Sequence, residues 1–160
     1  MYKIEKKVDT YWLAQAQKKY ATYMVVDENE KVLCELSVEK ESLKFKNEFI
    51  PSLKGKKVLH LFRFETKDGF RNKGYGKILL KEVLKRYKGK YDAIHLNACP
   101  YKHNKKNKYL IRYTAPSGGL KKTKLISFYE SFGFKKYGIV NFNEYDGKKN
   151  NYVVMILTKQ

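Results

Sequence analysis

The sequence has few of the features that mark metal-binding, secreted or membrane-spanning proteins. Its two cysteines, Cys34 and Cys99, lack C-x-x-C spacing, so a zinc or redox motif is not expected. We expect both of these residues to be buried thiols. Residues 1–17 contain no apolar run suited to a signal peptide, and no later run is long enough to span a bilayer. These absences favour a cytoplasmic protein that forms one domain over residues 1–160, with a long insertion at about 100–123.

Arginine is scarce although the chain is strongly basic. The formal net charge is +19, from 35 lysines and arginines against 16 acidic residues. Arginine occurs only at Arg63, Arg71, Arg86 and Arg112, whereas chains that read phosphates and base edges use arginine heavily. Two interpretations stay open: the charge attracts nucleic acid, an acidic protein or a phosphorylated ligand, or it reflects a compositional preference for lysine.

The hydrophobic patterns predict a mixture of strands and helices. We expect strands at 2–6, 21–26, 32–38, 58–66 and 91–98, a hairpin of 134–144 with 152–158, and helices at about 9–20, 75–87 and 124–132. The strand, turn, helix and strand from 58 to 98 predict a right-handed crossover with a parallel strand pair. Residues 100–123 are too long for an ordinary loop, so they form either a flap over a substrate or a disordered insertion.

The stretch FRNKGYGKILL, at 70–80, joins a predicted strand to a predicted helix through two glycines. Gly74 and Gly76 let the backbone curl around an anion, and the start of the helix adds its positive dipole end. Arg71 and Lys73 supply mobile positive charge. The turn is therefore either a phosphate site or a strand-to-helix connection that only needs glycine.

Two motifs at the expected separation resemble those of one enzyme superfamily. RNKGYG, at 71–76, matches the R-x-x-G-x-G turn of the GNAT superfamily of acyl-CoA-dependent N-acyltransferases. FYESFGF, at 128–134, resembles the second signature of that superfamily, and with HLF at His60 it is similar to arylalkylamine N-acetyltransferases. The resemblance covers about 58–158. It implies an α+β fold with a central mixed, mostly antiparallel sheet, flanking helices and a splayed parallel strand pair.

The resemblance also implies acetyl-CoA as co-substrate, with no metal. It places the diphosphate on the turn formed by Arg71, Asn72, Lys73, Gly74, Tyr75 and Gly76. It places the pantetheine arm along the backbone of Phe64 and Thr66, where the family usually has aliphatic residues. Asn97, with His95, would line the cleft where the two parallel strands part.

For catalysis, the resemblance implies that Tyr129 is the general acid that protonates the departing thiolate. The other interpretation of Tyr129 is a core aromatic residue packed with its neighbours. His60 is the candidate base, because an ordinary histidine titrates near about 6.5. Glu65 or a water molecule is the alternative, and on an undistorted strand Glu65 points away from the face that carries His60.

These features predict acetyl transfer from acetyl-CoA to a primary amine by direct attack in a ternary complex, in a monomer or homodimer. The sequence does not identify the amine. The alternative function is that of a noncatalytic protein with the same fold, which binds nucleic acid or an acidic partner through its basic surface.

Overall fold

A computed structural model describes residues 1–13, 15–40, 53–98, 101–103, 110–112, 124–143 and 149–158. The chain divides into two compact units, residues 1–94 and 95–158. Among the described residues, no helix is long and apolar enough to cross a membrane. The predicted single domain is not tested by this division and stays a prediction.

The first unit begins with a hairpin of two long antiparallel strands, β1 (Tyr2–Leu13) and β2 (Ala16–Asp27). The strands pair residue by residue from Tyr2 opposite Asp27 to Leu13 opposite Ala16. The predicted helix at about 9–20 is therefore wrong. Its apolar residues recur at helical spacing, but strand pairing along the whole hairpin overrides that local preference.

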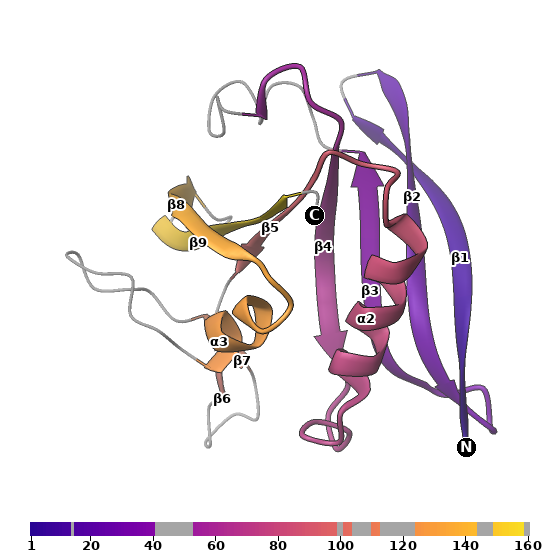
Figure 1. Ribbon diagram of the computed structural model, residues 1–160. Coiled ribbons are helices and arrows are strands. Elements are labelled where there is room, and N and C mark those ends of the chain that lie inside the picture. Colours follow the sequence, from indigo (N-terminus) through magenta and orange to yellow (C-terminus); the bar gives the residue numbers. More distant parts are fainter. Residues whose placement is uncertain are drawn as a thin grey trace. The chain divides into compact units, whose positions relative to one another are not determined.

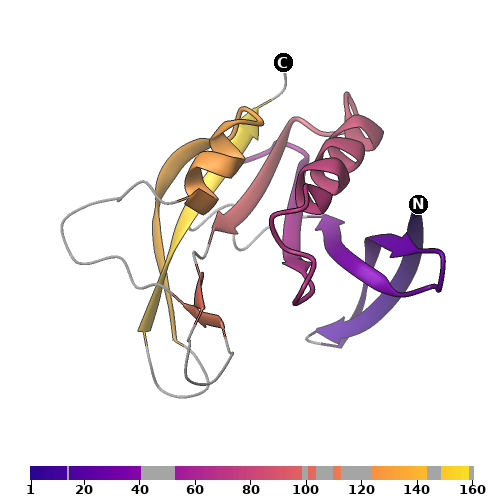
Figure 2. The same cartoon turned by 90° about the horizontal axis from the view of Figure 1, so that it is seen from below.

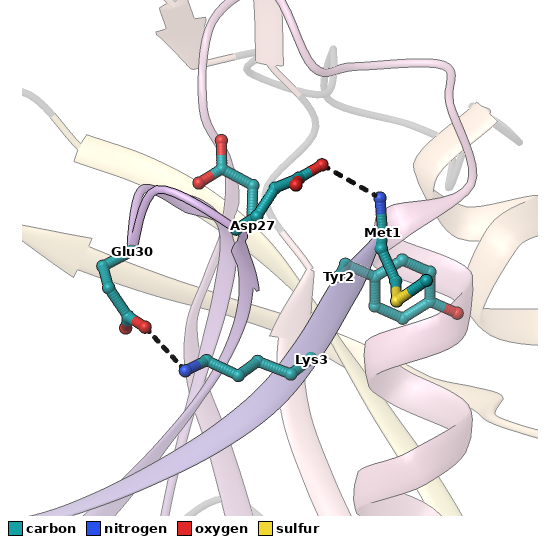
Figure 3. A pocket seen from close by; sticks show the side chains of 6 residues that line it. Met1, Tyr2, Lys3, Asp27 and Glu30 are labelled. Atoms are coloured by element: carbon teal, nitrogen blue, oxygen red, sulfur yellow. Dashed lines mark hydrogen bonds and ion pairs between the residues drawn. The ribbon is translucent and has the colours of Figure 1, made fainter.

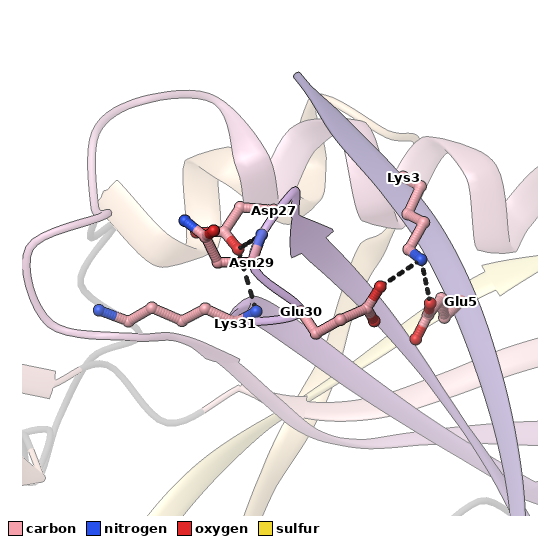
Figure 4. Close-up of polar contacts among 6 residues, drawn as sticks. All are labelled: Lys3, Glu5, Asp27, Asn29, Glu30 and Lys31. Carbon is pink, nitrogen blue, oxygen red and sulfur yellow. Dashed lines mark hydrogen bonds and ion pairs between the residues drawn. The ribbon is translucent and has the colours of Figure 1, made fainter.

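A tight acidic turn connects β2 to β3 (Val32–Lys40), and the two strands form the predicted antiparallel hairpin. The carboxylate of Asp27 accepts hydrogen bonds from the backbone N–H of Asn29 at 2.9 Å and of Lys31 at 3.0 Å (Figure 4). Glu30 adopts a φ of 61°, which the turn requires. The Lys3 ammonium lies between the carboxylates of Glu5 and Glu30, which ties the turn to β1.

β4 (Val58–Thr66) pairs antiparallel with β3, and helix α2 (Tyr75–Tyr87) packs on the sheet formed by β2, β3 and β4 (Figure 1). Apolar side chains of the helix and the sheet fill the space between them and are fully or almost fully buried: Val25, Leu36, Leu79, Leu80 and Val83. The predicted strand and amphipathic helix are both confirmed. This core fixes where the glycine turn ends and the helix begins.

β5 (Ala93–Ala98) starts beside β4 and continues into the second unit. The carbonyl of Lys57 accepts from Asp92 N at 2.7 Å, and Lys57 N donates to the Asp92 carboxylate at 2.8 Å. The two strands therefore start together, which is the parallel arrangement that the sequence predicted. Their predicted splay involves both units and stays a prediction.

The second unit holds β6 (Tyr101–His103) paired with β7 (Leu110–Arg112), then helix α3 (Lys124–Glu130). β8 (Lys135–Asn143) and β9 (Lys149–Thr158) form the predicted long antiparallel hairpin, a twisted ribbon in Figure 2. Within this unit β9 lies between β5 and β8. Most of the predicted insertion at 100–123 lies outside the described residues. The fold class is confirmed as α+β with a mixed, mostly antiparallel sheet.

Candidate active site

The glycine turn leaves the start of α2 open to an anion. Gly74, the residue before the helix, has a φ of 84°, and no side chain caps the first N–H groups. The first turn of the helix contains no acidic residue, so its positive dipole end is not neutralised there. A Cβ built at Gly74 would have no other atom within 4 Å. Glycine is therefore needed for its backbone angle, and the space beside it can admit a ligand.

Two cationic side chains lie on this turn, and each already has a contact within it. The Arg71 guanidinium pairs with the Asp68 carboxylate at 3.1 Å and donates to the Thr66 carbonyl at 3.4 Å. The Lys73 ammonium lies 5.4 Å from the centre of the Phe70 ring. Asp68 is mostly exposed, so its pair with Arg71 is weak in water and can give way to a diphosphate. The sequence did not indicate Asp68 as a competitor for Arg71.

β4 contains a β-bulge just before this turn. Leu36 lies opposite Phe64 and the next residue, Ser37, lies opposite Phe62, so Arg63 has no opposite residue on β3. Arg63 has a φ of 49°, in the left-handed region. A bulge reverses the alternation of side chains along the rest of the strand.

This reversal places Glu65 on the same face of the sheet as His60. Glu39 lies opposite His60 and Glu35 opposite Glu65, and on the regular strand β3 these two glutamates share a face. The expectation for an undistorted strand, with Glu65 pointing away from His60, is therefore wrong. The Lys67 ammonium bridges Glu35 at 3.5 Å and Glu65 at 3.6 Å.

His60 is held by a carboxylate that the sequence analysis missed. Its Nδ1 lies 3.3 Å from Glu39 Oε1, and the Tyr11 hydroxyl donates to Glu39 Oε2 at 2.7 Å. The exposed fraction is 19% for both His60 and Glu39, so the pair is partly shielded and still accessible. Burial alone would raise the pKa of the Glu39 carboxyl, but the hydrogen bonds from His60 and Tyr11 outweigh burial and leave that pKa below its ordinary value. The bond to Glu39 raises the pKa of Tyr11 to about 12.

The candidate general acid, Tyr129, belongs to α3 in the second unit. Its side chain is 7% exposed, and its ring contacts Phe128 and Phe134 at centroid distances of 5.4 and 6.0 Å. It therefore packs as a core aromatic residue. That packing holds the hydroxyl in a fixed position, which a proton donor also needs.

Asn97 lies on β5, also in the second unit. Its Oδ1 accepts a hydrogen bond of 2.8 Å from Nε2 of His95, whose side chain is completely buried. His95 therefore supports Asn97 from within the protein. The predicted contact of Asn97 with acetyl-CoA stays a prediction.

A small pocket lies at the end of the first unit's hairpins where the Tyr2 ring contacts the Tyr75 ring at a centroid distance of 6.0 Å, but none of the candidate site residues lines it. Its volume is about 180 Å³, and it is lined by Met1, Tyr2, Lys3, Asp27, Glu28 and Glu30 (Figure 3). Lys3 pairs with Glu30 at 2.6 Å, and the Met1 ammonium lies 3.7 Å from Glu28. Lys3 and the Met1 ammonium thus offset two of its three carboxylates. Among the described residues, no group of His, Cys, Asp or Glu side chains could hold a metal ion.

Comparison with known proteins identifies the family. The model of the acetyltransferase (GNAT) family matches residues 3–134. The chain therefore belongs to the acetyltransferase (GNAT) family, as its two motifs predicted. A search of the curated proteins found no match.

Solved structures share the fold at low sequence identity. NAA60 from Arabidopsis thaliana, in complex with a bisubstrate analogue, is 14% identical with a TM-score of 0.61, and the match covers 88% of this chain and 76% of NAA60. A second NAA60 structure contains acetyl-CoA, at 13% identity, a TM-score of 0.58 and coverage of 87% and 76%. Dodecameric spermidine N-acetyltransferase from Vibrio cholerae is 13% identical with a TM-score of 0.54. That match covers 88% of this chain and 65%, slightly less than two thirds, of the Vibrio protein.

The predicted site residues are thus divided between the two units. In the first unit, the predicted diphosphate turn comes a few residues after the end of β4. One face of β4 carries both His60 and Glu65. In the second unit are Tyr129 and Asn97. The missed groups, Glu39 and Tyr11, come from distant parts of the sequence, and only the strand register reveals them.

Proposed function

We propose that the protein transfers an acetyl group from acetyl-CoA to a primary amine. The observation that carries this proposal is the glycine turn: an uncapped helix start, opened by Gly74 in the left-handed conformation, with Arg71 and Lys73 beside it. These groups suit the diphosphate of acetyl-CoA, which Asn72, Tyr75 and Gly76 would complete. Membership of the acetyltransferase family and the fold shared with an acetyl-CoA complex support the proposal.

Direct transfer makes three chemical demands on the site. The attacking ammonium must lose a proton to expose its lone pair, because its ordinary pKa is about 10. Negative charge that develops on the thioester oxygen must be stabilised, for which backbone N–H groups near Phe64 and Thr66 are the candidates. The departing thiolate must gain a proton, and Tyr129 is the proposed donor. The nitrogen–carbonyl bond forms as the carbon–sulfur bond breaks.

We assign proton abstraction to His60, oriented by Glu39. A carboxylate that accepts from Nδ1–H fixes the tautomer in which Nε2 carries the lone pair. It also stabilises the imidazolium formed when that lone pair takes the amine's proton. Glu65 lies on the same face, but an ordinary carboxylate is a weaker base than an imidazole, and this carboxylate already contacts the Lys67 ammonium at 3.6 Å.

We expect the pH dependence of kcat/KM to separate these roles. His60→Gln should remove the acidic limb of the profile, which reports ionisation of the base in the free enzyme. Glu39→Gln should keep that limb but lower kcat/KM, because the imidazole loses the carboxylate that orients it. Glu65→Gln serves as the matched control and should leave the limb in place. A wild-type acidic limb in His60→Gln would exclude His60 as the base.

The charges around the turn predict opposite changes in acetyl-CoA affinity. Arg71→Glu should weaken binding at least about tenfold, because it places a carboxylate against the diphosphate. Asp68→Asn should tighten binding by about two- to fivefold, because it frees the guanidinium that Asp68 now pairs with. Lys81→Glu, at an exposed position of α2, changes the net charge as Arg71→Glu does and should have little effect. Isothermal titration calorimetry measures all three, and equal losses in Arg71→Glu and Lys81→Glu would show that only the overall charge matters.

A further inference from the structure

Strand β1 forms the edge of the first unit's sheet and is unusually long for an edge strand (Figure 1). It pairs with β2 on one side along its whole length, and among the described residues no strand pairs with its other side. Its exposed apolar side chains include Trp12, 71% exposed, and Val8, 46% exposed. An edge strand offers a row of unpaired backbone groups to another strand, and the lysines that would blunt this edge are accompanied by Glu5 and Asp9.

The two faces of β1 have different chemistry. Val8 and Trp12 share one face with Ile4, because alternate residues of a strand point the same way. Lys7 and Asp9 lie on the other face, 3.5 Å apart in one ion pair. One face of the strand therefore presents Ile4, Val8 and Trp12 with Lys6 and Thr10 between them, and the other face presents charges of both signs.

We propose that β1 pairs antiparallel with β1 of a second copy of this chain, around a two-fold axis at Val8. This register places Val8 opposite its own equivalent and the exposed Trp12 opposite Ile4, so these apolar side chains become neighbours across the strand pair. On the charged face it places Lys7 opposite Asp9, and by symmetry this pair forms twice. Each β1 strand thus pairs with the β1 strand of the other copy, and the two sheets join into one continuous sheet.

Charge selects this register over its neighbours. Moving the axis to Lys6 or Lys7 would set two identical lysines directly opposite each other, and moving it to Asp9 would set two aspartates opposite each other. Like charges directly opposite destabilise a strand pair. Between Lys6 and Asp9, only an axis at Val8 avoids such a pair.

A charge swap tests the proposal by sedimentation equilibrium of the full chain. Wild type should show a reversible dimer with a dissociation constant in the micromolar range, since one strand pair is a small interface. Lys7→Asp and Asp9→Lys should each weaken the dimer at least about tenfold, because each sets like charges opposite across the axis. The double variant Lys7→Asp/Asp9→Lys restores opposite charges and should recover the wild-type constant. A monomer at all concentrations, or a double variant as weak as the single ones, would overturn the proposal.

Disulfide trapping tests the register itself. Val8→Cys puts two thiols opposite each other on the axis, where the separation of Cβ atoms in a strand pair, about 4.5–5.5 Å, suits a disulfide after small adjustments. Under mild oxidation this variant should form a covalent dimer. Lys6→Cys lies on the same face, but its thiol would lie opposite that of the second copy only if the axis were at residue 6. It should therefore crosslink far less than Val8→Cys, and so should the wild type. Preferential crosslinking of Lys6→Cys would contradict the register.

Discussion

Tyr129→Phe should lose roughly ten- to ten-thousandfold in turnover, while acetyl-CoA affinity stays close to that of the wild type. The phenylalanine keeps the ring and its contacts with Phe128 and Phe134, so only the hydroxyl is removed. If that hydroxyl protonates the departing thiolate, its loss leaves a poor leaving group without a proton donor. Steady-state kinetics with one good amine acceptor, together with calorimetry of acetyl-CoA binding, measures the two effects separately.

The control for this experiment is an aromatic neighbour on the same helix. Phe128 also packs in the ring cluster, at 5.3 Å from Phe132, but has no hydroxyl. Phe128→Leu should lower the melting temperature and change turnover much less than Tyr129→Phe does. Normal turnover in Tyr129→Phe would leave Tyr129 with a packing role alone.

Gly74→Val should weaken acetyl-CoA binding by about a hundredfold. A β-branched residue at a φ of 84° costs roughly 1–3 kcal/mol of backbone strain, so the turn must change its path. Any valine that keeps the path places its side chain in the space that we assign to the diphosphate. Calorimetry with acetyl-CoA gives the affinity, and circular dichroism shows whether the variant folds.

Gly89 provides the matched position for this variant. It lies beyond the other end of α2, its φ is 77°, and a Cβ there would also have no other atom within 4 Å. Gly89→Val should therefore lose similar stability and keep its acetyl-CoA affinity. Equal affinity losses in the two variants would attribute the effect to strain and not to the ligand.

Local patterns in the sequence predicted those elements whose residues are close in the chain. The R-x-x-G-x-G turn, helix α2, the acidic turn after β2 and the hairpin of β8 and β9 all follow from short motifs or regular periodicity. The β1–β2 hairpin did not, because Trp12, Leu13 and Ala16 recur at helical spacing. Pairing along the whole of both strands decides that region, and pairing is not visible in a short window.

The composition of the site depends on features that periodicity cannot predict. The bulge at Arg63 shifts every later residue of β4 to the opposite face, so Glu65 joins His60. Nothing in the sequence of β4 marks Arg63 as the residue with positive φ. Glu39 reaches His60 only through the register of β3 with β4, and Tyr11 reaches Glu39 from the hairpin that the sequence analysis assigned to a helix.

The net charge of +19 has two interpretations: the basic surface binds an anionic partner, or the charge reflects a compositional preference for lysine. If the basic surface binds nucleic acid, affinity for a single-stranded oligonucleotide should fall steeply as salt rises, through counterion release. Acetyl-CoA makes fewer ionic contacts, so its affinity should fall more gently over the same range. Fluorescence anisotropy with a labelled oligonucleotide, beside calorimetry with acetyl-CoA, compares the two dependences.

The most direct test of the proposed function is acceptor-dependent release of CoA. Purified protein and acetyl-CoA are incubated with a panel of amines that includes polyamines, arylalkylamines, aminoglycosides, peptides with free N-termini and aminoacyl conjugates, and the released thiol is measured. We predict that at least one class accelerates release well above hydrolysis, that mass spectrometry finds the acetylated amine, and that Arg71→Glu abolishes most of the rate. Absence of acetyl-CoA binding by calorimetry, or a rate unchanged in Arg71→Glu, would contradict the account.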